Sequence, residues 1–92
     1  MIECDASGCR ITGAVTVASV GGLLRELQPQ LAKGLETLDF SGVEAADSAA
    51  LALIFSAMRQ VRKAGHTLTC TGLPSSFTTL AELYGVAELL PA

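Results

Sequence analysis

The sequence predicts an α/β fold, in which a mixed β-sheet of about four strands is packed against about three helices. Two observations lead to this fold class. A helical pattern after Asp47 lies between two short strand patterns, at residues 36–40 and 67–71. A strand, a helix and a strand in that order form a parallel β-α-β unit with a right-handed crossover. An N-terminal hairpin pattern precedes the unit, and the sequence shows neither linker nor repeat. We therefore expect residues 1–92 to form a single domain.

The N-terminal third predicts a hairpin followed by a helix. Residues 2–5 and 9–13 are short strand candidates, and Ala6-Ser7-Gly8 joins them. Residues 16–33 then change to a helical period and end at Gly34. Gly21-Gly22 and Pro29 weaken this helix, so it is expected to start late or to kink before the proline. Its apolar face is formed by Val20, Leu23, Leu24, Leu27 and Leu31.

The central segment predicts the longest helix. Residues 36–40 form a strand that ends at the turn-like pair Ser41-Gly42. Asp47 or Ser48 then caps a helix that runs to about residue 64, with Gly65 as its stop. One apolar stripe of this helix is expected to face the sheet, and it consists of Ala50, Leu51, Ile54, Phe55, Met58 and Val61.

The C-terminal segment completes the expected fold. Residues 67–71 are a β-branched strand, closed by Gly72 and Pro74. Ser75 or Ser76 is expected to cap a last helix that ends at Gly85, and residues 86–90 to form a tail turn packed on the body. The apolar residues of this helix are Phe77, Leu80, Leu83 and Tyr84.

Composition and charge exclude several classes of function. Half of the residues are apolar, 16% are charged, and the net charge is −3. Six basic residues are too few for a surface that neutralises several phosphates, so we expect no nucleic-acid partner. The N-terminus is acidic and the apolar runs are short, which predicts a cytoplasmic protein without direct membrane insertion. Cys4, Cys9 and Cys70 lack metal-ligand spacing and are interpreted as small buried residues.

The candidate catalytic residues do not form an active site. His66 follows the end of the long helix, whereas Ser48 lies at its beginning, about 24 Å away at 1.5 Å per residue. His66 therefore cannot act as a base toward Ser48. Acidic residues near the start of the helix, such as Asp47, suit the helix dipole better than a magnesium cluster. Gly21-Gly22 does not match a phosphate-binding loop. The prediction is a protein that is not an enzyme, with no catalytic residue, metal or cofactor.

The segment over residues 38–53 reads LDFSGVEAADSAALAL. It resembles the signature of the STAS domain family, which includes anti-sigma-factor antagonists and transporter-associated regulatory domains. The segments TGL at residues 71–73, TLAELYG at 79–85 and LLP at 89–91 resemble the MlaB branch. That branch consists of small cytoplasmic STAS subunits of the bacterial ABC transporter that maintains outer-membrane lipid asymmetry.

The resemblance implies an accessory subunit that binds the ATPase subunit of a phospholipid-transporting ABC system and supports its assembly and activity. The protein would then lie at the inner membrane through this partner. Ser48 matches the hydroxyl residue that contacts the partner in the MlaB branch and is phosphorylated in the antagonists. The alternative is an anti-sigma-factor antagonist, whose partner is a serine kinase that acts as the anti-sigma factor and phosphorylates Ser48.

The residues of the long helix add a hypothesis of their own. Opposite the apolar stripe, the first two turns carry small side chains where a solvated helix would carry long polar ones. Small residues let another backbone come close, Leu53 is expected to be an apolar anchor, and Arg59 to belong to a polar rim. The alternative is that alanine simply favours the helix. The predicted partner-binding residues are Ser48, Ala49, Ala52, Leu53, Ser56 and Arg59.

Overall fold

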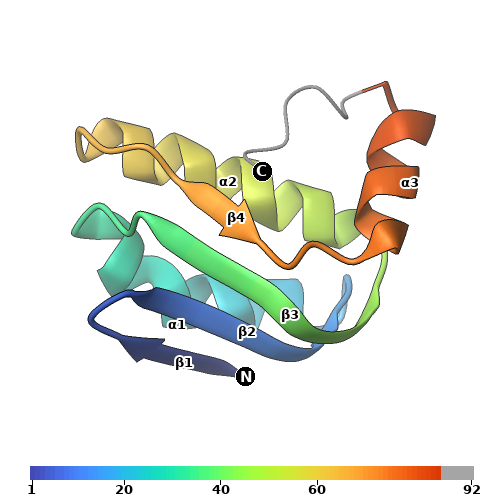
Figure 1. The fold of residues 1–92 in the computed structure, drawn as a ribbon, viewed down its shortest axis with the longest axis horizontal. Helices are drawn as coiled ribbons and strands as arrows, with labels where there is room; N and C mark the ends of the chain where they lie inside the picture. The colour runs from blue at the N-terminus through green and yellow to red at the C-terminus, as the bar shows by residue number, and fades with distance from the viewer. Residues whose placement is uncertain (86–92) are drawn as a thin grey trace.

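The computed structural model describes residues 1–85, which form a four-stranded sheet and three helices (Figure 1). The strands lie side by side in chain order. β1 is antiparallel to β2, while β2, β3 and β4 are mutually parallel. The predicted α/β class, mixed sheet and parallel β-α-β unit are therefore confirmed. In chain order the elements are β1 (Ile2–Asp5), β2 (Gly8–Val15), α1 (Val20–Ala32), β3 (Thr37–Ala46), α2 (Ser48–Lys63), β4 (Thr69–Thr71) and α3 (Ser75–Leu83).

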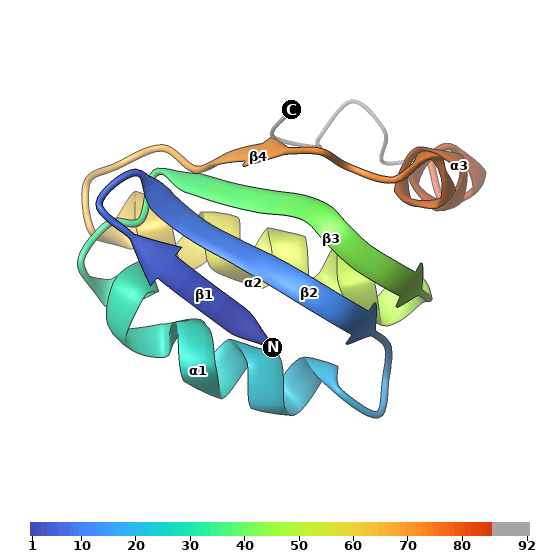
Figure 2. The same cartoon turned by 60° about the horizontal axis from the view of Figure 1, so that its bottom comes forward.

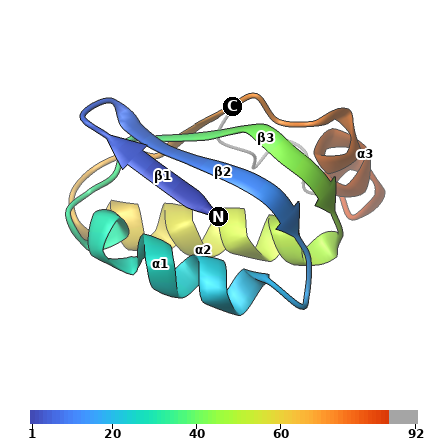
Figure 3. The ribbon, with the colours of Figure 1, turned by 90° about the horizontal axis from the view of Figure 1, so that it is seen from below.

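The two long helices cover the same face of the sheet. Figures 2 and 3 show α1 and α2 side by side beneath the strands, with α3 standing beyond the end of β3. Strand residues that point toward the helices are buried, including Ile11, Leu38 and Phe40. Phe77 of α3 packs edge-on against Phe40, with 5.4 Å between the ring centroids. The apolar core thus lies between the sheet and the helices, and α3 closes one end of it.

The other face of the sheet is polar. One row of paired residues crosses all four strands, from Glu3 through Arg10 and Asp39 to Thr71. Arg10 Nε lies 3.8 Å from Asp39 Oδ2, and the row alternates in charge over its first three members. Since side chains alternate across a strand, this row and the buried residues beside it belong to opposite faces. The helices therefore leave a polar sheet surface uncovered.

Strand β3 is longer than the sequence predicts. We expected it to end at Ser41-Gly42, but it continues to Ala46 through an irregularity in its pairing with β2. Arg10 pairs with Asp39 and Thr12 with Gly42, so β3 has one extra residue in this interval. A Cβ atom at Gly42 would meet the side chain of Thr12, so the glycine permits the close approach of the two strands.

The helix boundaries correct the expectations at several ends. Helix α1 does start late, at Val20, and it continues through Pro29 to Ala32. Helix α3 begins at Ser75 itself, so the expected serine cap is wrong: Pro74 occupies the N-cap position, and neither serine caps the helix with its side chain. Leu83 and Tyr84, which we expected on its apolar face, are 75% and 56% exposed. Strand β4 begins at Thr69, two residues later than predicted.

The cysteines contradict the interpretation that all three are isolated buried residues. Cys4 and Cys9 are opposite each other in the β1–β2 ladder and form a disulfide. Cys4 is exposed, and Cys9 belongs to the core. Cys70 alone is a buried thiol, and burial raises its pKa to about 12. The expected tail turn at residues 86–90 lies outside the described residues. Within residues 1–85, no helix has the length and apolar content to cross a bilayer.

Candidate partner-docking face on helix α2

The start of α2 is held by the carboxylate of Asp47. The Oδ1 atom of Asp47 accepts a hydrogen bond from the backbone N–H of Ala49 at 2.8 Å. The predicted cap at Asp47 is therefore confirmed, and the extended backbone of this residue is typical of an N-cap. Ser48 is the first residue of the helix and is exposed. Because Asp47 supplies the cap, the hydroxyl of Ser48 is not needed for it.

The opposite end of α2 is closed as predicted. Ala64 is the C-cap residue, and Gly65 follows with a φ of 85°, a conformation that glycine adopts readily. Arg62 and Lys63 lie in the last turn, where a positive charge interacts favourably with the helix dipole. Both ends of α2 are thus determined by local chemistry, and the helix is a rigid support for the side chains along its exposed side.

The buried side of α2 differs from the expected stripe. Ala50, Leu51, Ile54 and Val61 are buried as predicted. Leu53 and Ala57 are buried as well, each with no exposed surface. The prediction that Leu53 is an exposed anchor for a partner is therefore wrong. The helix packs on the sheet and also beside α1, so it buries a wider arc than one stripe facing the sheet. A Leu53→Glu variant would disrupt the core and cannot test docking.

Two other members of the expected stripe lie near the surface. Phe55 and Met58 are only partly buried, and Met58 packs against the edge of the core. Together with Arg59 and Arg62 they line a shallow hollow on the outer side of α2. The accessible apolar side chain on this helix is therefore Phe55, in place of Leu53. An aromatic ring held at the surface by a rigid helix is a common anchor in protein interfaces.

The remaining predicted partner-binding residues do share the outer side of α2. Ser48, Ala52 and Arg59 are exposed, and Ala49 and Ser56 are partly buried. Ser56 accepts a hydrogen bond from the side-chain amide of Gln60 at 3.3 Å. With the correction above, we define the α2 face as Ser48, Ala49, Ala52, Phe55, Ser56 and Arg59. Its first two turns carry small side chains at Ser48, Ala49 and Ala52, and its far end is basic.

A loop from elsewhere in the chain borders the start of this face. Asp47 Oδ2 accepts a hydrogen bond from the N–H of Val17 at 3.1 Å, and Asp47 N–H donates to the carbonyl of Val15 at 3.3 Å. Val17 itself is 80% exposed. The hydroxyl of Ser19 accepts from Thr16 N–H and donates to Ala14 O, both at 2.9 Å, which holds the loop in shape. An exposed apolar residue is thus fixed beside the N-terminus of α2.

The polar groups that could suggest chemistry lie apart from Ser48. His66 is at the other end of α2, where its Nδ1 is 3.2 Å from Glu36 Oε2. Asp39 lies on the polar sheet face, where hydrogen bonds from the Ser41 backbone and hydroxyl, with a smaller contribution from Arg10, lower the pKa of its carboxyl. Among residues 1–85, no group of three or more acidic, histidine or cysteine residues is arranged to hold a metal ion.

Two residues of this site were missed from the sequence. Phe55 was assigned to the apolar stripe that was expected to face the sheet. Val17 has no periodic pattern around it, and its place beside Asp47 depends on a hydrogen bond between residues 30 positions apart. A signal for the exposure of Phe55 was present in the sequence. Leu53 and Ala57 lie four residues apart and therefore share one side of the helix, and burying that side turns Phe55 toward the surface.

The comparisons with known proteins concern the family and the fold. The family model described as "Mlab, STAS domain" matches residues 3–91. The intermembrane phospholipid transport system binding protein MlaB of Escherichia coli K12 is 33% identical over 69 residues, which cover 74% of this chain and 71% of that protein. The protein of the same name from Shigella flexneri matches equally well.

A solved structure supports the fold independently. The anti-sigma factor antagonist SpoIIAA, in its unphosphorylated form, superimposes with a TM-score of 0.67 at 18% identity. The match covers 98% of this chain and 84% of that one. At this identity the likeness concerns the fold, and it confirms the expected STAS architecture of a mixed sheet with helices packed against it.

Proposed function

Since the chain belongs to the STAS domain family, through its Mlab model, we propose that it is a non-catalytic accessory subunit of a phospholipid-transporting ABC system. In this proposal, residues 1–92 act as a single domain that binds the cytoplasmic ATPase subunit of the transporter and supports its assembly and activity. The protein is cytoplasmic, reaches the inner membrane through its partner, and needs no cofactor. The two relatives are named as binding proteins of an intermembrane phospholipid transport system, which supports the choice of system.

The observation that carries the proposal is the α2 face itself. A helix side exposed to water ordinarily carries long charged or amide side chains. Here Ser48 and Ala52 are exposed in the first two turns, and Phe55 is partly exposed in the next. Small residues permit close approach of a partner helix or loop, and a central aromatic ring provides apolar contact. Val17 extends this apolar surface beyond the end of the helix.

Charge is distributed unevenly along the docking face, with the basic residues toward the C-terminal end of α2. Arg59 and Arg62 border the hollow beside Phe55, and Lys63 follows in the last turn. The start of the helix carries the Asp47 carboxylate, whose oxygens are already used by the N–H groups of Ala49 and Val17. A partner with small or apolar residues opposite Ala52 and acidic residues opposite the arginines would fit this pattern. Such charge complementarity increases the association rate and makes it sensitive to salt.

The test is a binding measurement with paired variants. Ala52→Arg places a long charged side chain in the centre of the α2 face without disturbing buried residues. Ala6→Arg makes the same change at an exposed alanine in the hairpin turn, far from this face. We expect Ala52→Arg to weaken binding to the purified ATPase subunit at least tenfold and Ala6→Arg to leave it unchanged. Equal affinity of both variants and wild type would refute docking through this face.

The alternative function keeps the same face but changes the partner. An anti-sigma-factor antagonist would be phosphorylated at Ser48 by a serine kinase. One feature favours it: Ser48 is exposed at the start of a helix, and its hydroxyl is spared from capping by Asp47. A phosphate at a helix N-terminus is stabilised by the helix dipole, so the fold would tolerate it. Incubation with a cognate kinase and ATP, followed by mass spectrometry, separates the alternatives. Phosphate on Ser48 supports the antagonist, whereas recovery of the ATPase with membrane subunits supports the transporter.

A further inference from the structure

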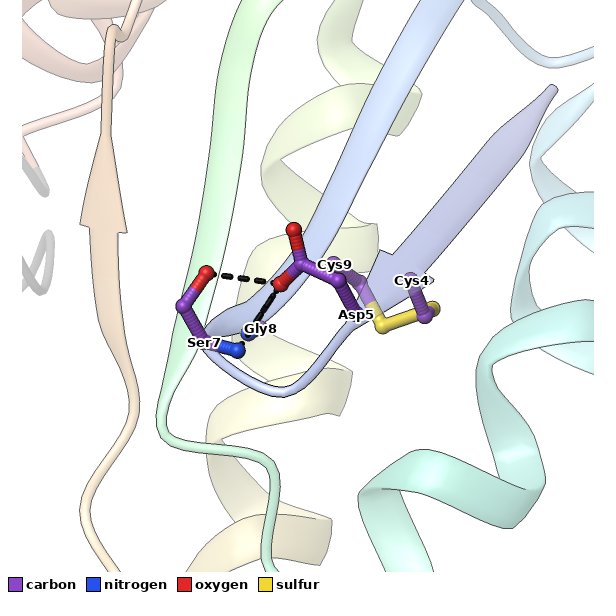
Figure 4. The surroundings of a disulfide bond; sticks show 5 residues. All are labelled: Cys4, Asp5, Ser7, Gly8 and Cys9. Carbon is purple, nitrogen blue, oxygen red and sulfur yellow. Dashed lines mark hydrogen bonds between the residues drawn. A yellow bond between two sulfur atoms is a disulfide. The ribbon is translucent and has the colours of Figure 1, made fainter.

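The β1–β2 hairpin contains a cross-strand disulfide at an edge of the sheet. Cys4 and Cys9 are direct partners in the antiparallel ladder, with their Cα atoms 4.0 Å apart (Figure 4). Within residues 1–85, β1 pairs only with β2 and is an edge strand of the sheet. The site lies at the end of the sheet where Cys9 pairs with Leu38, whereas the start of α2 follows Ala46, which pairs with Val15 at the other end. It is therefore separate from the α2 face.

The two sulfur-bearing residues differ in their access to solvent. Cys4 is exposed on the edge strand, whereas Cys9 is 3% exposed and packs in the core. Cys4 is therefore the more accessible of the two residues to a reagent approaching from water. Thiol–disulfide exchange requires a direct attack on one sulfur atom, along the line of the bond. The geometry allows attack at Cys4 with Cys9 as the leaving group.

Besides the disulfide, β1 is held at this end by its pairing with β2 and by the hydrogen bonds of the turn. Of its four residues, Ile2 alone is partly buried, and it packs against the core. The far end is fastened by a pair of hydrogen bonds, from Thr12 N–H to Met1 O at 2.9 Å and from the Met1 amino group to Thr12 O at 3.0 Å. The turn is closed by Asp5 Oδ1, which accepts from Ser7 and Gly8. These contacts are exposed, and exposed edge contacts open easily.

We propose that Cys4–Cys9 is a reversible thiol–disulfide modification site, at which a dithiol reductant of the thioredoxin class releases strand β1 and an oxidising disulfide restores it. A thiolate of the reductant attacks Cys4 Sγ, forms a mixed disulfide and expels Cys9 Sγ as a thiolate, which takes a proton from water. The second thiolate of the reductant then attacks the reductant's first sulfur, which is bonded to Cys4 Sγ in the mixed disulfide. This step releases Cys4 as a thiolate, which takes a proton from water. Two electrons and two protons pass to the protein, and the reductant leaves as a disulfide.

Cys70 is excluded from this exchange by its position. It pairs with Leu38 on β3, and Leu38 pairs with Cys9 on β2. Cys9 and Cys70 are therefore two strands apart, about 10 Å at the usual spacing, which is too far for a bond without rearrangement of the sheet. Cys70 is also buried, and its raised pKa keeps it as an unreactive thiol. The switch thus involves one pair of cysteines.

The experiment measures what reduction does to the full chain. The oxidised protein is treated with dithiothreitol without denaturant, and the reductant is then removed. Thiols are counted by alkylation in denaturant and mass spectrometry, so that the buried thiols react as well. We expect one thiol before reduction and three after it. Amide hydrogen exchange at residues 2–5 should accelerate by tenfold or more, on the order expected for opening a short closed loop, while α2 exchange is unchanged. Bond reduction that requires denaturant, or unchanged exchange in β1, would overturn the proposal.

Single variants test the asymmetry of attack. Incubation with glutathione disulfide should form a mixed disulfide at Cys4 in Cys9→Ser much faster than at Cys9 in Cys4→Ser, because Cys9 is buried. Circular dichroism checks that both variants are folded. If one is not, the rates of mixed-disulfide formation at Cys4 and at Cys9 are compared in the reduced wild-type protein instead. Cys70→Ser should retain the complete response. Equal labelling of the two single variants, or loss of the response in Cys70→Ser, would show that the assigned pair does not behave as a surface exchange site.

Discussion

Asp47 and Val17 are 30 residues apart in the sequence, yet the carboxylate of Asp47 accepts the backbone N–H of Val17 at 3.1 Å. The other oxygen of the same carboxylate caps α2 through Ala49. One side chain therefore sets where the helix begins and also holds the β2–α1 loop against that beginning. The proposed docking surface depends on this connection, because it combines a helix face with an exposed residue of the loop.

Replacement of Asp47 tests this double role. Asp47→Ala should lower the free energy of unfolding by about 1–2 kcal/mol, since loss of an N-cap has that magnitude. Ser48→Ala should change it by less than about 0.5 kcal/mol, as is usual for an exposed residue without a capping role. Urea denaturation followed by circular dichroism measures both. The reverse order of effects would mean that Ser48 supplies the cap.

Substitutions at the adjacent positions Ala52 and Leu53 of α2 should differ greatly in their effect on stability. Leu53→Ala is expected to destabilise the fold by about 2–5 kcal/mol, because Leu53 is completely buried and the change leaves a cavity. Ala52→Arg should alter stability by less than about 0.5 kcal/mol, because Ala52 is exposed and arginine favours helix. Thermal or urea unfolding of the two variants checks the orientation of the helix. Similar losses in both would place Ala52 in the interior.

The two glycines that end α1 and α2 form a matched pair. Gly34 and Gly65 have φ values of 84° and 85°, so alanine is strained at both. A Cβ atom at Gly34 would clash with the ring of His66, whereas at Gly65 it would meet open space. We expect Gly65→Ala to cost about 1 kcal/mol and Gly34→Ala clearly more, measured by urea unfolding. Removing the ring with His66→Ala in the Gly34→Ala background should recover the difference; no recovery would place the cost elsewhere.

The hairpin turn should lose stability in acid. Hydrogen bonds from the Ser7 hydroxyl and from the Ser7 and Gly8 backbone lower the pKa of Asp5 below the ordinary aspartate value of 3.8. A group with a lowered folded-state pKa adds stability that is complete above the unfolded value and disappears as the pH falls through the folded value. NMR titration should therefore find the Asp5 pKa below 3.8, and Ser7→Ala should raise it, because the Ser7 hydroxyl is the largest cause. An unchanged pKa in the variant would contradict this hydrogen-bond assignment.

The hairpin shows that the residues of a turn can predict which residues pair across its two strands. Ala6-Ser7-Gly8 was correctly interpreted as a turn, and the strands on either side were found. Pairing outward from a turn centred on Ala6 and Ser7 makes Asp5 face Gly8 and Cys4 face Cys9. The disulfide was therefore within reach of local reasoning, and it was missed because the cysteines were compared only with metal-ligand spacings.

The sequence by itself determined the elements whose signals are local. The cap at Asp47, the glycine stops after α1 and α2, and the order of strands and helices all follow from residues within a few positions of one another. The tertiary structure decided how α2 is turned about its axis, burying Leu53 and leaving Phe55 at the surface, and it brought Val17 to Asp47. The physical reason is that α2 packs against both the sheet and α1. The width of a buried arc depends on such neighbours, which periodicity along one helix does not contain.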